Sequence, residues 1–433
     1  MAKSWVTDLW TKTAIIGGER VAPTAAQLRK IKSLPDEFRT ARFGKGNRWR
    51  VGWVDPQGKQ RTRTYATRAA ADEYAASLDE DLRVGRYTSP ENAGKTFDDV
   101  ATLWLASKRK AKGSTIWRYT RDLDRWVRPK WGSMPIGQID RAAVETWVDE
   151  LTSGTAPISQ DAKRRNVGGL APKTVQGIVG IAFGSPMRWA LEQRWITENP
   201  LRRIELPQPD DGDDETPALS YLEVELLADA VRTIPRPKRA VNESDGQVSY
   251  TLVQFLAYTG LRINEACALD WRDVDLHKRR VRVRSTWTVD KTGKRVIGPP
   301  KGWERRTVPL PAHVVALLEA TERKDRVGWV FKSPRGEALD DKNWRNRVWA
   351  PAIREVGLDG FTIHGLRHTA VSNAIAAGAD VKLIQLMCGH KSATMTLDVY
   401  GHLWPDRLDE VVDAVSEARR RALVVPVRLV EDL

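Results

Sequence analysis

The chain has 433 residues, of which 41% are hydrophobic, and this length favours two to four globular domains with sizeable cores. Lysine and arginine number 70 against 56 acidic residues, so the net charge of +14 makes nucleic acid the first partner to consider. Two cysteines exclude a disulfide scaffold, and no segment reaches the ~18 apolar residues of a membrane span. The N-terminus also lacks the apolar core of a signal peptide, so we expect a soluble cytoplasmic protein.

The N-terminal part changes in character at residue 39. Residues 1–38 are mixed in composition, and we expect an extension with one short helix near Ala25–Lys32. Between residues 39 and 68 basic residues dominate, and Asp55 is the single acid. We assign residues 39–92 to a separate small domain.

This small domain is expected to be a sheet backed by one helix. Residues 48–54 alternate between basic and apolar side chains, the period-two pattern of a half-buried strand. A turn at residues 55–58 leads into a second strand, and Thr67 caps a helix that ends near Val84. A sheet with a basic outer face can enter a DNA groove, although a merely solvated basic sheet is the alternative. The DNA contacts expected on that face are Arg48, Arg50, Arg61 and Arg63.

Residues 93–206 are predicted to be all helical. Apolar residues at helical spacing indicate a packed core, and the last helix is expected to be interrupted at Pro186. The predicted helices are Phe97–Arg109, Ser114–Val127, Arg141–Thr152 and Pro172–Trp195. Residues 207–217 contain two prolines and a run of acids, so we interpret them as a linker between domains.

Residues 218–405 are predicted to form a second large domain of helices and strands. Its strands are joined through a Gly- and Lys-rich hairpin region at Asp290–Trp303. The predicted helices are Thr251–Tyr258, Ile263–Leu269 and Ala312–Glu322, and the predicted strands are Arg279–Val289 and Arg305–Leu310. Residues 406–433 form a tail with a helix at Asp406–Ala422 and an apolar end that Pro426 restricts to an edge strand.

Four of the six histidines lie within residues 361–402. His364 and Arg367 are three apart, so they share one face of a helix if Thr362 caps it. A short amphipathic helix then stops at a glycine just before His390, and Tyr400 follows ten positions later. This combination indicates an anion site with a phenol nucleophile nearby.

A zinc site is the alternative for these histidines, because His364 and His368 are four residues apart. The metalloprotease pattern requires a glutamate directly after the first histidine, where this chain has Gly365. Arg367 between the two histidines would also repel a cation. We therefore expect no metal here.

Arg262 is the natural partner of Arg367 in binding an anion. Two guanidiniums can hold both non-bridging oxygens of one phosphodiester, and Glu265 can brace Arg262 from the same helix face. A phenol with a pKa of ~10 is about 4 kcal/mol from ionisation at pH 7, and positive charge around the phosphate can offset more than that. The leaving 5′ oxygen needs a proton donor, for which Lys301 is the candidate and Lys294 and Lys291 are competitors.

Over residues 96–405 the chain resembles the tyrosine recombinases, the lambda-type integrases. Five motifs occur in the family's order: Thr259-Gly-Leu-Arg-Ile-Asn-Glu-Ala, Pro300-Lys with Arg306-Thr-Val-Pro-Leu, His364-Gly-Leu-Arg-His, Leu386-Met-Cys-Gly-His and Val399-Tyr-Gly-His. The resemblance implies a multidomain α+β protein with a three-stranded N-terminal sheet plus helix, an all-helical core-binding domain and a mixed α/β catalytic domain. Residues 39–92 are similar, more loosely, to the arm-type DNA-binding domains of phage integrases.

The family's reaction assigns a role to each matching position. Tyr400 would attack the scissile phosphate to give a 3′-phosphotyrosine, without ATP, metal or any other cofactor. Arg262 and Arg367 would clamp the phosphate, and Lys301 would be the general acid. The remaining positions are His364 for proton transfer, His390 for a hydrogen bond to the phosphate, and Glu265 for support.

We therefore expect a site-specific integrase of a phage or another mobile element, acting on the nucleoid of a bacterial host. Its partners would be core-type and arm-type attachment sites on duplex DNA, three further copies of the chain in a tetramer, and DNA-bending and directionality factors. A type IB topoisomerase and a catalytically silent DNA-binding regulator are the alternatives. The separate basic domain argues against the first, and the intact set of catalytic residues argues against the second.

Overall fold

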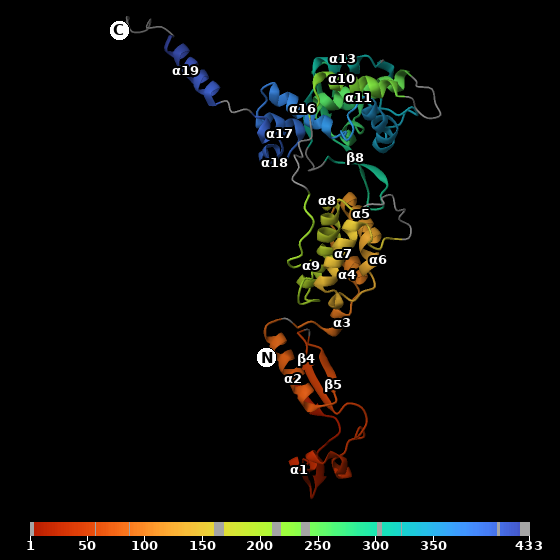
Figure 1. Cartoon of the computed structure of the whole chain (residues 1–433), viewed down its shortest axis with the longest axis vertical. Coiled ribbons are helices and arrows are strands. Elements are labelled where there is room, and N and C mark those ends of the chain that lie inside the picture. Colours follow the sequence, from red (N-terminus) through yellow and green to blue (C-terminus); the bar gives the residue numbers. More distant parts are fainter. Residues whose placement is uncertain are drawn as a thin grey trace. The chain divides into compact units, whose positions relative to one another are not determined.

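The computed structural model describes residues 4–56, 58–85, 87–159, 169–209, 218–234, 243–300, 305–321, 323–404 and 408–424. The chain divides into two compact units, Met1–Asp210 and Asp211–Leu433, which are considered separately below (Figure 1). Among the described helices, none combines the length and apolar character that crossing a membrane requires.

The first unit begins with the predicted three-stranded sheet, which is antiparallel and has the order β1-β4-β5. Its elements are β1 (Trp5–Asp8), β4 (Trp49–Val54), β5 (Gln60–Tyr65) and the covering helix α2 (Arg68–Arg83). The core between sheet and helix contains Val51, Trp53, Ala71 and Leu78. Strand β1 comes from the segment expected to be an extension, so the sheet starts well ahead of residue 39. Trp5 lies so close over Gly52 that a Cβ atom at position 52 would be 2.6 Å from its ring.

Residues 9–48, which we call the insert, connect β1 to β4. The insert contains β2 (Ala14–Ile16), β3 (Glu19–Val21), α1 (Ala25–Arg29), η1 (Ile31–Ser33) and η2 (Asp36–Phe38). A capping box between Thr24 and Gln27 starts α1, and Ala14, Leu34 and Phe38 form a small buried core. The insert is therefore a folded module between two neighbouring strands.

The rest of the first unit is all helical, as predicted. The helices are α3 (Pro90–Ala93), α4 (Phe97–Ser107), α5 (Gly113–Asp122), η3 (Leu123–Val127), α6 (Arg128–Trp131), η4 (Ile136–Gln138), α7 (Arg141–Ser153), α8 (Pro172–Gln176), η5 (Gly177–Phe183) and α9 (Gly184–Glu192). Phe97, Trp131, Trp147 and Phe183 pack against one another in its core. The predicted interruption at Pro186 is wrong, because α9 continues through this residue. The helix departs from α geometry one turn earlier, in the π-helical η5. Pro186 lacks the amide that the carbonyl of residue 182 would bind in a regular α-helix.

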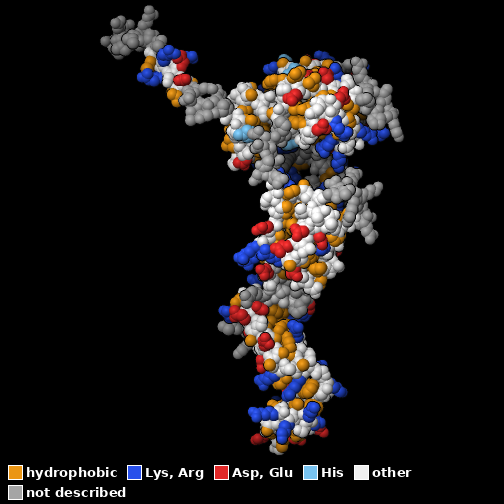
Figure 2. Space-filling view, in the orientation of Figure 1, with side chains coloured by type: hydrophobic (Ala, Val, Ile, Leu, Met, Phe, Trp, Pro, Cys, Tyr) orange, Lys and Arg blue, Asp and Glu red, His pale blue; other side chains and the backbone are white. Residues whose placement is uncertain are grey.

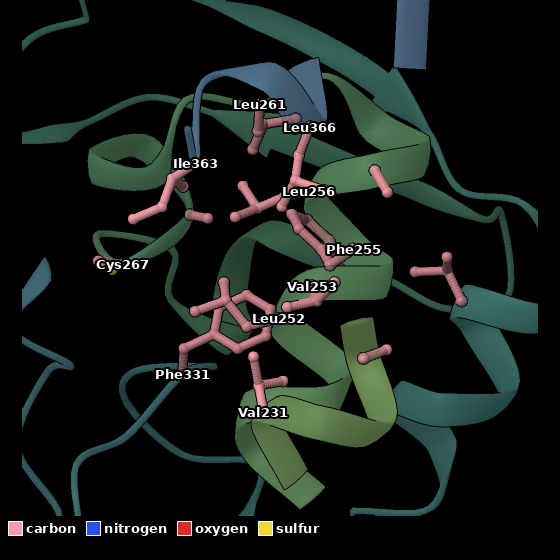
Figure 3. Packing of buried hydrophobic residues seen from close by; sticks show 14 of the residues in the cluster. Val231, Leu252, Val253, Phe255, Leu256, Leu261, Cys267, Phe331, Ile363 and Leu366 are labelled. Atoms are coloured by element: carbon pink, nitrogen blue, oxygen red, sulfur yellow. The ribbon is translucent and has the colours of Figure 1, made fainter. Parts of the chain in front are cut away.

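The second unit is built around α11, whose side chains fill the main core (Figure 3). Its helices are α10 (Tyr221–Thr233), α11 (Glu243–Thr259), α12 (Ile263–Ala266), η6 (Trp271–Asp273), α13 (Ala312–Glu319), η7 (Arg323–Asp325), α14 (Asp341–Trp344), η8 (Arg345–Trp349), α15 (Ala350–Glu355), α16 (Gly365–Ala376), α17 (Val381–Cys388), α18 (Ala393–Tyr400), η9 (Gly401–Leu403) and α19 (Leu408–Val424). One sheet has the order β10-β7-β6, and β8 and β9 form a separate hairpin. The strands are β6 (Val274–Asp275), β7 (Arg280–Val283), β8 (Thr286–Val289), β9 (Arg295–Gly298) and β10 (Arg306–Pro309).

The single strand predicted at Arg279–Val289 is in fact two, β7 and β8, which belong to different sheets. The hydroxyl of Ser285 donates to the carbonyl of Ala268 at the point where the chain leaves the first sheet. The predicted edge strand near Pro426 lies outside the described residues.

The strand register corrects the prediction for two of the four arginines in the N-terminal sheet. Arg61 is paired with Trp53 and Arg63 with Val51, so both point to the face that α2 covers. Arg61 holds the buried Asp55 at 3.0 Å and also pairs with Glu91, while Arg63 lies over the rings of Tyr65 and Tyr74. The expectation that Arg61 and Arg63 belong to the open face is therefore wrong.

The other two arginines of that prediction have different surroundings. Arg48 is bound to Asp8, with 2.7 Å between Nη2 and the carboxylate. Arg50 is paired with Thr7 and Thr64 on the open face, and it is the one cation among the strand residues of that face.

Replacing Arg61 with Met should loosen the sheet, because Asp55 would stay buried without its guanidinium partner. We expect faster hydrogen exchange in β4 and β5 of the full chain. Arg63→Met is the matched control, since Arg63 forms no ion pair with a described residue, and it should change exchange much less. Equal exchange in the parent protein and the Arg61→Met variant would show that the ion pair does not support the sheet.

Candidate active site

The residues singled out from the sequence come together where α12, β10, α16, α17 and α18 meet. Thr362 closes the turn before α16, because its hydroxyl accepts a hydrogen bond from the amide of Gly365 at 3.1 Å, and His364 is the N-cap residue of the helix. Glycine is needed at position 365, since a Cβ atom there would be 2.6 Å from the ring of Phe361. His364 is exposed just before the helix, and Arg367 lies in its first turn, where it is only 2% exposed.

Arg367 is fixed by three acceptors. Its guanidinium donates to the carbonyl of Gly260 at 2.7 Å, to that of Cys388 at 2.8 Å, and to Nε2 of His390 at 2.8 Å. Gly260 has a φ of +65°, a left-handed conformation that favours glycine, and this turn ends α11. These bonds use only part of the five N–H groups of the guanidinium, so Arg367 keeps donors for an anion.

Glu265 joins the second arginine to a third one. Its side chain is only 1% exposed, and it binds Arg262 at 3.0 Å and Arg306 at 2.6 Å. Burial alone would raise the pKa of this carboxyl, but Arg306 and Arg262 together hold the pKa below its ordinary value. The pairing of Arg262 with Glu265 follows the predicted spacing, whereas Arg306 was predicted only as a strand residue.

Arg306 also links this carboxylate to the end of α17. Its Nε donates to the carbonyl of Met387 at 3.0 Å, next to the Cys388 carbonyl that binds Arg367. No sequence spacing reveals this contact, because Arg306 and Met387 are far apart in the chain and meet only through packing of β10 against α17.

His390 is neutral in this arrangement. Since a guanidinium has no acceptor, Nε2 of His390 accepts from Arg367, and Nδ1 then donates to the hydroxyl of Thr396 at 2.9 Å. Burial, followed by the charge of Arg367, lowers the pKa of His390 to about 4. The contribution of Thr396 was not anticipated from the sequence.

Tyr400 is the last residue of α18 and is only 4% exposed. Its ring lies 5.4 Å from that of His368, which in turn is 5.2 Å from His364. Burial, and next the neighbouring Cys388, raise the pKa of Tyr400 to about 12, although Arg367 and Arg262 oppose the shift. The phenol is therefore protonated in the structure.

The structure describes two of the three lysines considered as proton donors. Lys301 lies outside the described residues. Lys291 and Lys294 are exposed in the turn between β8 and β9, and among the described residues no contact joins them to the arginine and histidine cluster. The described part of the chain contains no group of three or more acidic, histidine or cysteine side chains suited to a metal ion. What the site offers is excess positive charge beside a phenol, which suits a phosphodiester.

The pKa of Tyr400 can be tested by titrating phenolate absorbance in the ultraviolet. The difference between the parent protein and Tyr400→Phe should show one tyrosine that ionises near pH 12. In denaturant, the tyrosine seen in this difference should ionise with the ordinary pKa of ~10. Because the phenol ionises more easily in the unfolded chain, its contribution to stability should be lost as the pH rises through this interval. A folded-state transition at the ordinary value would contradict the buried position.

Comparison with known proteins supports the resemblance to the tyrosine recombinases. Residues 220–407 match the phage integrase family. The chain is 29% identical over 325 residues to the tyrosine recombinase XerC of Xanthomonas campestris pv. campestris (strain B100), an alignment that covers 73% of this chain and 87% of the relative. It is 25% identical over 357 residues to the prophage integrase IntR of Escherichia coli (strain K12), covering 75% and 80%.

Solved structures share the fold. One is the Tn1549 transposon integrase in complex with transposon right end DNA, with a TM-score of 0.56 and 18% identity over 75% of this chain and 99% of that one. Another is a lambda integrase dimer bound to a COC′ core site, with a TM-score of 0.51 and 16% identity over 83% and 93%. The multidomain α+β architecture inferred from the sequence is confirmed by these likenesses. Residues 220–407 belong to the phage integrase family, and the likenesses support a tyrosine recombinase of the lambda integrase type, a site-specific recombinase.

Proposed function

We propose that the chain is the integrase of a phage or another mobile element, which cuts and rejoins duplex DNA through a 3′-phosphotyrosine intermediate in a bacterial cell. The observation that carries this proposal is the position of Tyr400 in the same buried cluster as the two arginines. Both guanidiniums act on the pKa of its phenol, so a phosphate bound to them would lie near the nucleophile. A prophage integrase and a transposon integrase are among the similar proteins.

In the proposed reaction, Arg262 and Arg367 hold the two non-bridging oxygens of the scissile phosphate. The Tyr400 oxygen attacks phosphorus, its proton passes to His364, and the bond from phosphorus to the 5′ oxygen breaks. The 5′ oxygen takes a proton, for which Lys301 is the proposed donor and His364 assists transfer. Attack by the 5′ hydroxyl of a new strand reverses these steps, so the energy of the phosphodiester is kept.

His390 must change partner to assist this reaction. In the structure Nε2 of His390 accepts a hydrogen bond from Arg367, so this nitrogen has no proton to donate to an anion. A bound phosphate would draw donors from Arg367 and favour a proton on Nε2, since negative charge raises the pKa of a nearby imidazole. We infer that His390 donates to the phosphate only in the DNA complex.

The proposal extends to the whole assembly. The N-terminal sheet would contact arm-type DNA through its open face, where Arg50 is the expected contact, while the helical part and the second unit would bind the core site. Four protomers would join two duplexes, helped by DNA-bending and directionality factors. The tail with α19 would dock either on its own protomer or on a neighbouring one.

Tyr400→Phe should abolish the covalent adduct while leaving DNA binding nearly unchanged, because only one oxygen is lost. The measurement is trapping of protein on a nicked attachment-site duplex, followed by a denaturing gel. Tyr250→Phe, which removes a hydroxyl that donates to Glu225, is the matched control and should still form adduct. An adduct formed by the Tyr400→Phe variant would overturn the assignment.

Lys301→Ala should slow cleavage by about 10²-fold to 10⁴-fold on an ordinary duplex, the usual range for loss of a general acid. A 5′-bridging phosphorothiolate should restore the rate, because sulfur leaves without protonation. Lys294→Ala is the control and should behave like the parent enzyme on both substrates. If Lys301→Ala slows both substrates equally, Lys301 is not the acid.

A further inference from the structure

The positive charge of the chain is concentrated in the insert, residues 9–48. This segment has nine lysines and arginines against three acids, so it carries +6 of the net charge of +14. Arg39 pairs with Asp36 and Arg48 with Asp8. The remaining cations are exposed and form no ion pair with any residue that the structure describes: Lys12, Arg20, Arg29, Lys30, Lys32, Arg42 and Lys45. Figure 2 shows Lys and Arg side chains over the part of the chain that holds α1 in Figure 1.

The sheet itself offers little charge to DNA. Among the strand residues of the open face, Arg50 is the one cation, because Arg61 and Arg63 point to the covered face. Lys59 and Arg61 are both held by Glu91. Helix α2, on the opposite side, has five acids against two arginines, so it would repel a phosphate backbone. Duplex DNA carries one negative charge per ~1.7 Å, and a single arginine neutralises little of it.

Backbone hydrogen bonds join the two arms of the insert where it leaves the sheet. The amide of Leu9 donates to the carbonyl of Arg48 at 2.7 Å, which extends the pairing of β1 with β4 into the insert. The amide of Lys12 donates to Phe38 at 2.9 Å, and that of Thr40 to Trp10 at 3.0 Å. The charges therefore lie at one end of the open face, on a folded module.

The hairpin of β2 and β3 adds an apolar contact to these charges. Ile15 is 75% exposed and stands directly opposite Arg20, and Gly17 and Gly18 form the tight turn between the strands. An exposed aliphatic side chain beside a cation suits the edge of a DNA groove, where apolar side chains contact thymine methyl groups.

We propose that the insert is the phosphate-binding part of the N-terminal DNA interface. The open face of the sheet enters a groove, and the insert lies along the backbone of the same duplex and supplies most of the charge neutralisation. This inference rests on the proposed DNA contact of the sheet, and it assigns the affinity of that contact to residues outside the sheet.

The test compares the affinity of full-length variants for duplex DNA from the region that flanks the gene, across a range of salt concentrations. Tyr400→Phe is present throughout, so that only binding is measured. The triple variant Arg29→Gln, Lys30→Gln, Lys32→Gln should lower the salt slope of log affinity by up to about 2.7, since each phosphate contact contributes about 0.9. The matched control, Lys59→Gln, Arg68→Gln, Arg83→Gln, removes the same charge from the rest of the domain and should leave the slope unchanged.

Three results would overturn the proposal, and Arg50→Ala separates the first two. If Arg50→Ala weakens binding but the insert triple variant retains the parent affinity and slope, the sheet binds DNA without the insert. If neither Arg50→Ala nor the insert triple variant changes binding to any of the DNA duplexes, the N-terminal domain makes no DNA contact. The proposed arm-binding role of the domain and the proposed role of the insert are then both wrong. An equal loss of the salt slope in the insert triple variant and in the control variant would also contradict the proposal, because the loss would then depend on net charge alone.

Discussion

The active site depends on one buried carboxylate, that of Glu265. An ionised carboxylate removed from water is strongly destabilising unless cations and hydrogen bonds compensate, and here Arg262 and Arg306 both do so. Arg306 then reaches the end of α17, beside the carbonyl that orients Arg367. Like-charged guanidiniums repel each other, so Arg262 and Arg306 lie close together because one negative group binds both. Glu265 provides that group from within the protein, before any phosphate arrives.

The same packing leaves two titratable side chains of the candidate site uncharged. The phenol of Tyr400 has a pKa of about 12 and His390 one of about 4, so at neutral pH both are uncharged. The donors of Arg367 are partly used by backbone carbonyls. In the proposed reaction such a state is useful, since water and stray anions meet a protonated Tyr400.

The sequence was sufficient for features set by short spacings along the chain. The turn before α16 and the stop of α17 at Gly389 depend on neighbouring residues, and both occur as expected. The family resemblance agrees with the phage integrase match over residues 220–407. Arg306 could not be connected to Glu265 in this way, because the contact depends on how a strand packs against a distant helix.

In the N-terminal sheet, the sequence pattern does not decide which residues are exposed. Alternation along β5 indicates that Arg61 and Arg63 share a face, but only the register with β4 decides which face the helix covers. Strand β1 has only four residues, and it is recognisable as a strand only through its pairing with β4. The sequence therefore indicated β4, β5 and α2, but not β1 or the face on which the strand residues are exposed.

The position of the insert has an evolutionary consequence. Strands β1 and β4 are antiparallel neighbours, so the ends that the insert joins are already close together, whatever its length. The entropy of closing a loop grows only with the logarithm of its length, so segments can be gained or lost at this point with little effect on the sheet. The surface of the N-terminal domain can in this way change among related proteins while the residues of the candidate active site stay the same.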